Sequence, residues 1–240
     1  MRQRATSMSA IRNLLIAAPS PAVWTPASEP AGTFSLWLDA QDRGSYTSSG
    51  GFIAMLGDKS GSGNHAVQAA DSLKPIEMDD GFKIQDGRYF NSALSASNNS
   101  ETAFVVCSNF DLGGNRTILG ASANGGRQFR TTSSNMQLVR ASVAAVATSS
   151  SLPVQTNINC ILECQVELGA PVVFGLNGAL QSTASHTTGF SAGTVTQIGA
   201  SLGGQGAQIT GREVLILPSK PSAQLADRIR TYLKSKWAIS

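Results

Sequence analysis

Charged residues are scarce in this sequence. Asp, Glu, Lys and Arg make up 14% of the 240 residues, about half of the share found in an average soluble protein. The formal net charge of +3 arises at the start of the chain, where Arg2, Arg4 and Arg12 precede the first acidic residue, Glu29. The remaining chain is balanced in charge, which argues against a broad nucleic-acid-binding surface. We therefore expect no nucleic-acid partner.

Histidine and cysteine are also rare. Two histidines are too few for a histidine-based metal site or a catalytic triad, so we expect no resident cofactor. Cys107, Cys160 and Cys164 are an odd number of cysteines, which argues against a disulfide framework. Cys160 and Cys164 lie about 13 Å apart if the run is a strand, beyond the roughly 7 Å limit for a disulfide. We expect buried, reduced thiols, as in a protein assembled in a cytosol.

Long apolar runs are absent from the sequence. No run approaches the roughly 20 residues needed to span a membrane, so we expect no membrane partner. The basic N-terminus is followed by an apolar run at residues 14–18, which is shorter than the core of about 7–15 residues in a secretory signal. We therefore interpret the N-terminus as something other than a signal peptide.

Short strand patterns fill the chain from residue 33 onward. "NINCILECQVEL" alternates apolar and mostly polar residues with a period of two, and "AFVVCS" is apolar on both faces, as in a covered central strand. Asn177-Gly178 predicts a tight hairpin turn. Many short strands with turn residues every 8 to 12 positions indicate an all-β sandwich or jelly roll.

Both ends of the chain depart from this pattern. Residues 1–32 combine a short apolar run with four prolines, which predicts an extended N-terminal arm. Near the other end, Leu225, Ile229, Leu233 and Trp237 recur every four residues, as on the apolar face of a helix over about residues 221–237. We expect one sandwich domain over residues 33–240, closed by that helix.

Several motifs together resemble a known family. "LWLDAQD", "DKSGSGNHAVQ", "GFKIQDGRYF" and the late "GREVLILPSKPSAQLADRIRTYLKSKW" are similar to the concanavalin A-like, laminin-G-like jelly rolls found in phage virion proteins and bacterial surface proteins. The resemblance covers residues 34–238. It implies the concanavalin A-like jelly-roll fold and a role in a virion, while such folds serve lectins, glycosidases and structural modules alike.

The glycine-rich stretch between Asp58 and Asn64 has two interpretations. Asp58 can accept backbone N–H bonds across a turn, with Gly61, Gly63 and Asn64 in left-handed conformations. Asp58 and Asn64 are also candidate calcium or glycan ligands. Calcium prefers 6 to 8 oxygen ligands, usually with several carboxylates, and only one carboxylate is local. We favour the turn.

"ECQVE" is the one constellation typical of an enzyme. Glu163, Gln165 and Glu167 lie on one face of a predicted strand, and they resemble the Glu-x-Asp-x-Glu motif of retaining β-glucanases with this fold. Such enzymes use two carboxylates about 5 to 5.5 Å apart. Gln165 stands where that motif has its central acid. An uncharged amide cannot shift the pKa values of the neighbouring carboxyl groups as an acid would. We interpret the motif as a solvated polar face, with glycan binding as an alternative, and we predict that the protein is not an enzyme.

The N-terminal arm suggests attachment to a larger assembly. Its basic and apolar side chains are suited to docking on a partner, and we assign this role to Arg2, Arg4, Arg12, Leu14, Leu15, Ile16 and Trp24.

We therefore predict a phage virion protein, assembled in a bacterial cytoplasm, that decorates or cements the capsid. Its expected partners are a major capsid or tail protein and further copies of itself. A carbohydrate-binding adhesin that contacts a surface glycan is the alternative, and a glycoside hydrolase is third.

Overall fold

The computed structural model describes residues 23–95, 99–109, 111, 113–122, 124–132, 135–140, 144–149, 152–191, 195–200 and 206–240. Its strands, in chain order, are β1 (Leu36–Asp39), β2 (Tyr46–Ser49), β3 (Phe52–Leu56), β4 (Ala66–Val67), β5 (Ile76–Met78), β6 (Gly81–Ile84), β7 (Phe90–Ser95), β8 (Ser100–Asn109), β9 (Asn115–Ala121), β10 (Arg127–Thr132), β11 (Asn135–Arg140), β12 (Ala144–Thr148), β13 (Cys160–Glu167), β14 (Pro171–Leu176), β15 (Ala179–Ser185), β16 (Val195–Ile198) and β17 (Ile209–Leu217). The helical elements are the short 3₁₀ helices η1 (Pro26–Ser28), η2 (Arg43–Ser45) and η3 (Asp71–Leu73), and the α-helix α1 (Ala223–Trp237).

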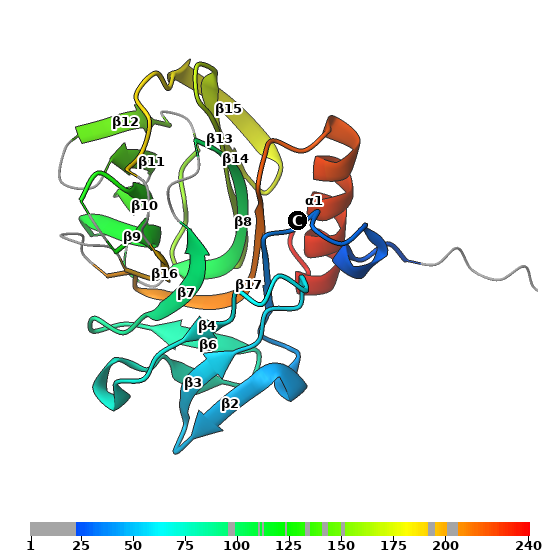
Figure 1. The fold of residues 1–240 in the computed structure, drawn as a ribbon, viewed down its shortest axis with the longest axis vertical. Helices are drawn as coiled ribbons and strands as arrows, with labels where there is room; N and C mark the ends of the chain where they lie inside the picture. Colours follow the sequence, from blue (N-terminus) through cyan, green and yellow to red (C-terminus); the bar gives the residue numbers. More distant parts are fainter. Residues whose placement is uncertain are drawn as a thin grey trace, which may run out of the picture.

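One layer of the sandwich is a sheet centred on β17 and β8. Antiparallel pairing gives the order β1–β17–β8–β13–β14–β15, and β6 extends the β1 edge by pairing with the first residues of β17. Helix α1 packs on the outer surface of this layer, at the right of the molecule in Figure 1. We call it the helix-side layer.

The second layer faces the inner surface of the first. Its order is β12–β11–β10–β9–β16–β7–β4–β3, with β2 on the far edge of β3. Strand β5 pairs with both β3 and β6, so the hydrogen-bonded ladder continues from one layer into the other. The result is a sandwich whose two layers join along one side.

Alternating side chains of the helix-side layer fill two separate cores. On β8, Ala103, Val105 and Cys107 face the inner core, while Phe104 and Val106 face α1. The predicted two-faced apolar strand in "AFVVCS" is therefore confirmed, because both of its faces are covered. The second core is completed by side chains from the segment before β1, from the strands and from the helix, which are Phe34, Trp37, Ile161, Leu215, Leu217, Ala226, Ile229, Leu233 and Trp237.

Local sequence signals explain the ends of several elements. Asn177 and Gly178 connect β14 to β15 with φ values of 52° and 88°, as the hairpin prediction required. Ser222 caps α1 by accepting a hydrogen bond from the backbone N–H of Leu225 over 3.2 Å. Lys234 and Lys236 lie in the last turn, where cations are favoured. The predicted closing helix is confirmed, and it begins two residues later than expected.

The predicted fold class, an all-β sandwich with a closing C-terminal helix, is confirmed. The strand predicted in "NINCILECQVEL" is shorter than expected, because β13 covers only Cys160–Glu167. The apolar residues beyond its two ends, Ile158 and Leu168, are 53% and 44% exposed. Residues 1–22 of the predicted arm lie outside the described residues, and the boundary at residue 32 stays a prediction.

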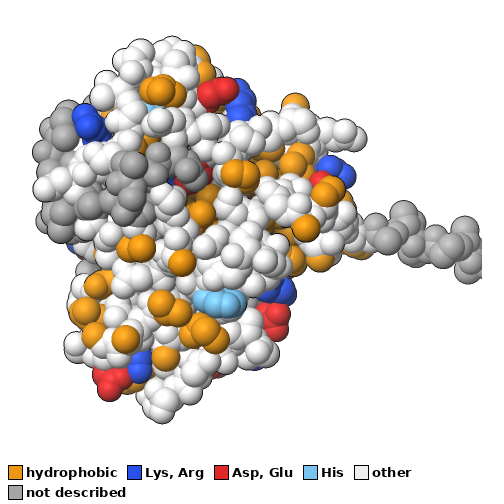
Figure 2. All heavy atoms as spheres, viewed as in Figure 1, with side chains coloured by type: hydrophobic (Ala, Val, Ile, Leu, Met, Phe, Trp, Pro, Cys, Tyr) orange, Lys and Arg blue, Asp and Glu red, His pale blue; other side chains and the backbone are white. Residues whose placement is uncertain are grey.

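The surface carries few charges. Figure 2 shows one face of the molecule, on which Lys, Arg, Asp and Glu side chains are few and scattered among uncharged atoms. This agrees with the low charged fraction of the sequence, 14%. None of the helices in the described part of the chain is both long and apolar enough to cross a membrane.

Candidate functional site on the helix face

A buried carboxylate joins α1 to the helix-side layer. Glu213 of β17 is 0% exposed. Its Oε1 accepts hydrogen bonds from the indole of Trp37 over 2.9 Å and the hydroxyl of Tyr232 over 3.0 Å. Its Oε2 accepts from the indole of Trp237 over 2.7 Å and the ammonium of Lys236 over 2.9 Å. Four donors occupy the two oxygens, so this carboxylate serves the packing of the helix.

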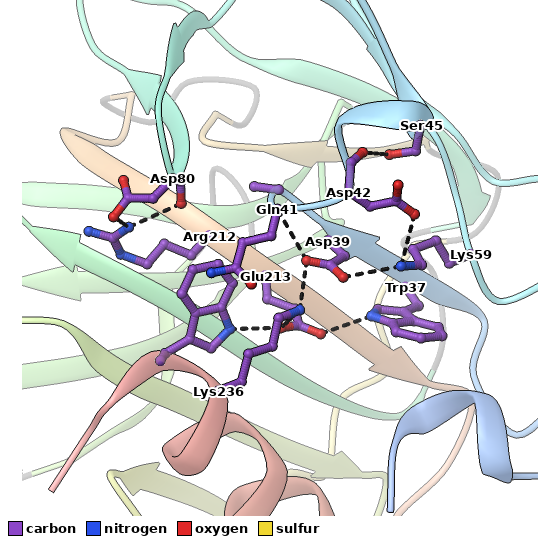
Figure 3. Close-up of polar contacts among 12 residues, drawn as sticks. Trp37, Asp39, Gln41, Asp42, Ser45, Lys59, Asp80, Arg212, Glu213 and Lys236 are labelled. Carbon is purple, nitrogen blue, oxygen red and sulfur yellow. Dashed lines mark hydrogen bonds and ion pairs between the residues drawn. The ribbon is translucent and has the colours of Figure 1, made fainter. Parts of the chain in front are cut away.

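Lys236 extends this contact into a network of alternating charges. Its ammonium lies between Glu213 and Asp39, 2.7 Å from the Asp39 carboxylate, and Lys59 bridges Asp39 over 3.1 Å and Asp42 over 2.9 Å (Figure 3). Burial acts to raise the pKa of Asp39, but the bonds from Lys236 and Lys59 outweigh it and the pKa is lowered. The network ties α1 to β1 and to the segment around η2.

Two of the three "ECQVE" residues, Glu163 and Gln165, are buried rather than in solvent. Glu163 has a side chain only 1% exposed, and Arg230 of α1 donates to both of its oxygens, from Nε over 2.9 Å and from Nη2 over 2.8 Å. Gln165 donates to the same carboxylate over 2.6 Å. The prediction of a solvated polar face was wrong for Glu163 and Gln165, because the sequence pattern did not show that Arg230 of α1 pairs with Glu163 and that Gln165 bonds to the same carboxylate. Glu167 alone is exposed.

This arrangement restricts the chemistry available to Glu163. A carboxylate paired side-on with a guanidinium has both oxygens engaged, and Arg230 also contacts Asp227 over 2.7 Å. The bond to Glu163 raises the pKa of Arg230 against the opposing effect of burial. Glu163 is thus an ion-pair partner that fixes α1. A glycan-binding role for Glu163, Gln165 and Glu167 stays a prediction.

Trp24 is attached to the outer side of α1. Its indole N–H donates to Glu29 over 2.7 Å, and its ring meets Tyr232 edge-on, with centroids 5.9 Å apart. The guanidinium of Arg228 lies 5.5 Å from the centre of the Trp24 ring and 2.9 Å from the Glu29 carboxylate. Trp24 therefore packs on its own chain, and the partner contact assigned to it stays a prediction.

A groove of about 570 Å³ opens beside Trp24. We call it the α1 groove, and it is lined by Val23, Trp24, Gln224, Asp227, Arg228, Thr231, Tyr232 and Ser235. Val23, the first described residue, is 80% exposed at its edge. The other residues assigned to docking, Arg2, Arg4, Arg12, Leu14, Leu15 and Ile16, lie outside the described residues.

Asp58 holds the glycine-rich turn together. One carboxylate oxygen accepts from the backbone N–H groups of Trp37 and Ser60, each over 2.9 Å. The other accepts from the Ser60 hydroxyl and the Asn64 backbone N–H, also over 2.9 Å. The Asn64 side chain in turn donates to the carbonyl of Ser35 over 2.8 Å. This geometry is that of a turn anchored to β1, whereas calcium or glycan binding at Asp58 and Asn64 stays a prediction.

Both histidines lie in the described part of the chain. No group of three or more His, Cys, Asp or Glu side chains there is placed to hold a metal ion. His186 is buried and stacks on Phe190 with centroids 4.7 Å apart. Burial lowers the pKa of His186, which favours the neutral form. His65 accepts a hydrogen bond from the Asp58 backbone N–H at Nδ1 over 3.0 Å.

The sequence interpretation missed a buried ion pair in the inner core. Arg127 of β10 lies 2.6 Å from Glu101 of β8, and each side chain is 2% exposed. Burial raises the pKa of Glu101, and the charge of Arg127 opposes that rise. A signal was present, because Glu101 alternates in phase with the apolar Ala103 and Val105. A charge on the apolar face of a strand indicates a buried partner.

Comparisons with known proteins define the class of fold. No protein-family model and no curated protein sequence matches the chain. Among solved structures, the binding domain of botulinum neurotoxin serotype D is similar with a TM-score of 0.61 and 14% identity, over 84% of this chain and 52% of that chain. A second structure of that domain, in complex with N-acetylneuraminic acid, gives a TM-score of 0.61 and 15% identity over 88% of this chain and 53% of that one.

Trypanosoma rangeli sialidase is similar with a TM-score of 0.58 and 14% identity, over 88% of this chain and 34% of that chain. The chain thus spans about a third of the sialidase and about half of the neurotoxin domain. At these identities the similarity shows the fold, which is an all-β sandwich shared with those proteins.

Proposed function

We propose that this chain is a non-catalytic attachment module, whose sandwich body is held on a larger assembly through residues 1–22 and the α1 groove. The observation that carries the proposal is the anchoring of Trp24 on α1. Its contacts with Glu29, Tyr232 and Arg228 fix the start of the described chain at the groove. Following the family resemblance, the assembly is a phage virion and the module decorates its capsid.

The chemistry of the partner follows from the two parts of the attachment surface. The α1 groove offers the indole of Trp24, the ring of Tyr232 and the exposed side chain of Val23. Residues 1–22 add the apolar run at residues 14–18 and three arginines. A matching partner is a protein surface that presents an apolar segment flanked by carboxylates, because apolar contact supplies affinity and opposite charges supply orientation.

A non-catalytic role agrees with the use of the buried carboxylates. Glu213 accepts four hydrogen bonds from the helix and β1, and Glu163 is paired side-on with Arg230. Asp58 is occupied by its own turn. A general acid or nucleophile needs an oxygen that can reach substrate, and these three carboxylates direct theirs into the protein.

The sparsely charged surface suits packing against further copies of the chain. A body with balanced charge has little net repulsion between identical surfaces, and Figure 2 shows no dense patch of one sign on the face in view. We therefore include homo-oligomeric contacts within the assembly in the proposal.

The test is a truncation that keeps Trp24. A variant starting at Val23 retains the contacts on α1, whereas removal of residues 1–32 would also take away Trp24 and Glu29. In a density gradient of purified particles, we expect the full chain to sediment with the particles and the Val23 variant to remain unbound. Circular dichroism and the urea unfolding midpoint should match those of the full chain.

Equal sedimentation of the truncated and full chains would contradict attachment through residues 1–22. A Trp24→Ala variant separates the groove from the segment, because it removes the indole while leaving residues 1–22 in place. We expect partial loss of particle binding for this variant, with Glu167→Gln as the matched control at an exposed position outside the groove.

Carbohydrate binding is a second candidate function, and one surface feature favours it. A hollow of about 360 Å³ is lined by Ser49, Phe52, Asp71 and Lys74. Arg88 stacks over the Phe52 ring at 4.8 Å. An aromatic ring beside hydroxyl, carboxylate and cationic groups is a suitable surface for a sugar. Lys74 pairs with Asp71, and Arg88 over the Phe52 ring adds a second cation beside the hollow. The excess of one cation favours an acidic sugar such as N-acetylneuraminic acid, the ligand named in one of the similar structures.

A glycan array that includes sialylated and neutral oligosaccharides tests this candidate. We expect binding of sialylated glycans that is lost in Phe52→Ala and retained in Lys220→Gln, a change at an exposed position that does not line this hollow. An array without binding, or binding that Phe52→Ala leaves unchanged, would contradict a glycan site at this hollow.

A further inference from the structure

Two of the three cysteines face each other across neighbouring strands. Cys107 of β8 and Cys160 of β13 are direct partners in the antiparallel register. Both side chains belong to the inner core, and the Sγ of Cys160 lies 3.4 Å from the carbonyl oxygen of Cys107. Direct antiparallel partners have Cα atoms about 4.5 to 5.5 Å apart, within the range of about 4.4 to 6.8 Å found in disulfides.

Cys164 is set apart from this pair by the same register. It lies on β13 with Cys160, and its direct partner on β8 is Ala103. Cys160 and Cys164 lie on one strand, as their alternating sequence pattern predicted. Cys107 is 53 residues away in the sequence from Cys160 and is brought opposite to it by the pairing of β8 with β13.

Cys160 borders a hollow in the surface, and Cys164, which is 3% exposed, has almost the same exposed fraction. Cys160 itself is 4% exposed and lines this hollow of about 260 Å³ together with Pro153, Gln155, Ile158, Leu176 and Asn177. Cys107 is 0% exposed, and its pKa is held well above the usual value by the hydrogen bond with the Cys160 thiol and by burial. Burial likewise raises the pKa of Cys164. A small reagent in the hollow therefore meets Cys160 first.

We propose that Cys107 and Cys160 are a dithiol pair which a small peroxide oxidant converts into a cross-strand disulfide, with Cys160 as the thiol that reacts first. In the first step the sulfur of Cys160 attacks one oxygen of hydrogen peroxide. An S–O bond forms, the O–O bond breaks, and the departing hydroxide takes the thiol proton to become water. Cys160 is now a sulfenic acid.

In the second step the sulfur of Cys107 attacks the sulfur of Cys160. The S–S bond forms, the S–O bond breaks, and the hydroxide leaves as water with the proton of Cys107. The two thiols are oxidised by two electrons in total, and one peroxide is reduced to two waters. The crosslink joins β8 to β13, the two strands that carry Phe104, Val106 and Ile161 beneath α1, and it restricts the unfolded chain.

The experiment uses the folded full-length chain and hydrogen peroxide. After quenching, thiols are counted in denaturant with Ellman's reagent, and peptides are mapped by mass spectrometry without reduction. We expect the count to fall from three thiols to one, with one linked peptide pair that contains Cys107 and Cys160 and a mass lower by two hydrogen atoms. The urea unfolding midpoint of the oxidised chain should be higher, and dithiothreitol should restore it.

Cys164→Ser is the matched control, because Cys164 is a buried cysteine on the same strand. It should still form the Cys107–Cys160 link. Cys107→Ser should stop at a sulfenic acid on Cys160, which dimedone traps, and Cys160→Ser should leave Cys107 and Cys164 as thiols. Where a serine variant does not fold by circular dichroism, the corresponding alanine variant replaces it.

Two results would overturn the proposal. One is the survival of all three thiols in the folded chain under conditions in which the same peroxide oxidises the urea-unfolded chain. The other is a product in which Cys164 is linked, or in which the link joins two chains on a non-reducing gel. The unfolded sample shows that the reagent is active, so retention of the thiols contradicts the proposal directly.

Discussion

The indole of Trp237 donates a hydrogen bond over 2.7 Å to the buried carboxylate of Glu213. This bond joins the last residue of α1 to the strand β17 at the centre of the helix-side layer. Trp37 of β1 donates to the other oxygen of the same carboxylate over 2.9 Å. Two tryptophans that are far apart in sequence thus share one acid, which makes Glu213 the main polar attachment of the helix.

Replacement of Glu213 by Gln should destabilise the protein strongly. The amide keeps the shape but removes the charge that meets Lys236, and in either orientation its NH₂ group faces an indole N–H donor, that of Trp37 or that of Trp237. We expect a loss of about 2–4 kcal/mol in the free energy of unfolding, since a broken buried polar contact leaves groups without partners. Urea denaturation at pH 7 measures this, and Glu167→Gln, at an exposed site, should change the value by less than about 0.5 kcal/mol. Equal values for the two variants would show that Glu213 is not the attachment point.

A double-mutant cycle tests the pair formed by Glu163 and Arg230. Arg230→Gln alone should cost about 3–5 kcal/mol, because it leaves the buried Glu163 carboxylate without its cation. Adding Glu163→Gln should recover part of that loss, with a coupling energy above about 1.5 kcal/mol. Asp227→Asn is the control, since Asp227 also contacts Arg230 but has a side chain that is 73% exposed. If the effects of Arg230→Gln and Glu163→Gln on the free energy of unfolding are additive, the ion pair does not contribute to stability.

The lowered pKa of Asp39 predicts a specific dependence of stability on pH. Burial acts to raise this pKa, and the bonds from Lys236 and Lys59 lower it by more. A carboxyl group whose pKa is lower in the folded state contributes stability above its unfolded pKa of about 3.9, and the contribution disappears as pH falls through the folded value. Asp39→Asn should therefore be less stable at pH 7 and should lose less stability between pH 5 and pH 2. Urea unfolding between pH 2 and pH 7 measures the free energy of unfolding of the natural sequence and of Asp39→Asn. If that free energy changes with pH equally in the two proteins, Asp39 does not cause the pH dependence.

Much of the sandwich was predictable because its strands carry clear local signals. The alternation over β13 and the two-faced apolar run in β8 both correspond to observed core contacts. Asn177-Gly178 gave the hairpin because few residue pairs tolerate two positive φ angles in succession. The apolar stripe of Leu225, Ile229, Leu233 and Trp237 located the helix to within two residues.

The side-chain contacts between distant elements were harder to predict. The polar face of "ECQVE" was interpreted as solvated, since alternation shows which residues share a face but not what covers that face. The burial of Glu163 depends on Arg230, which is 67 residues away in sequence. The opposition of Cys107 and Cys160 likewise depends on strand pairing. The charge of Glu101, in phase with apolar neighbours, was a usable signal that the interpretation passed over.

The Asp58 turn provides a prediction that separates its two interpretations. Asp58→Ala removes the acceptor of four hydrogen bonds from Trp37, Ser60 and Asn64, and we expect a loss of about 2–3 kcal/mol because backbone N–H groups lose their partner. If the carboxylate serves the turn alone, the thermal unfolding midpoint of the natural sequence should be the same in calcium and in EDTA. A midpoint that rises with calcium in the natural sequence and not in Asp58→Ala would instead establish a metal site, with Asp58 as one of its oxygen ligands.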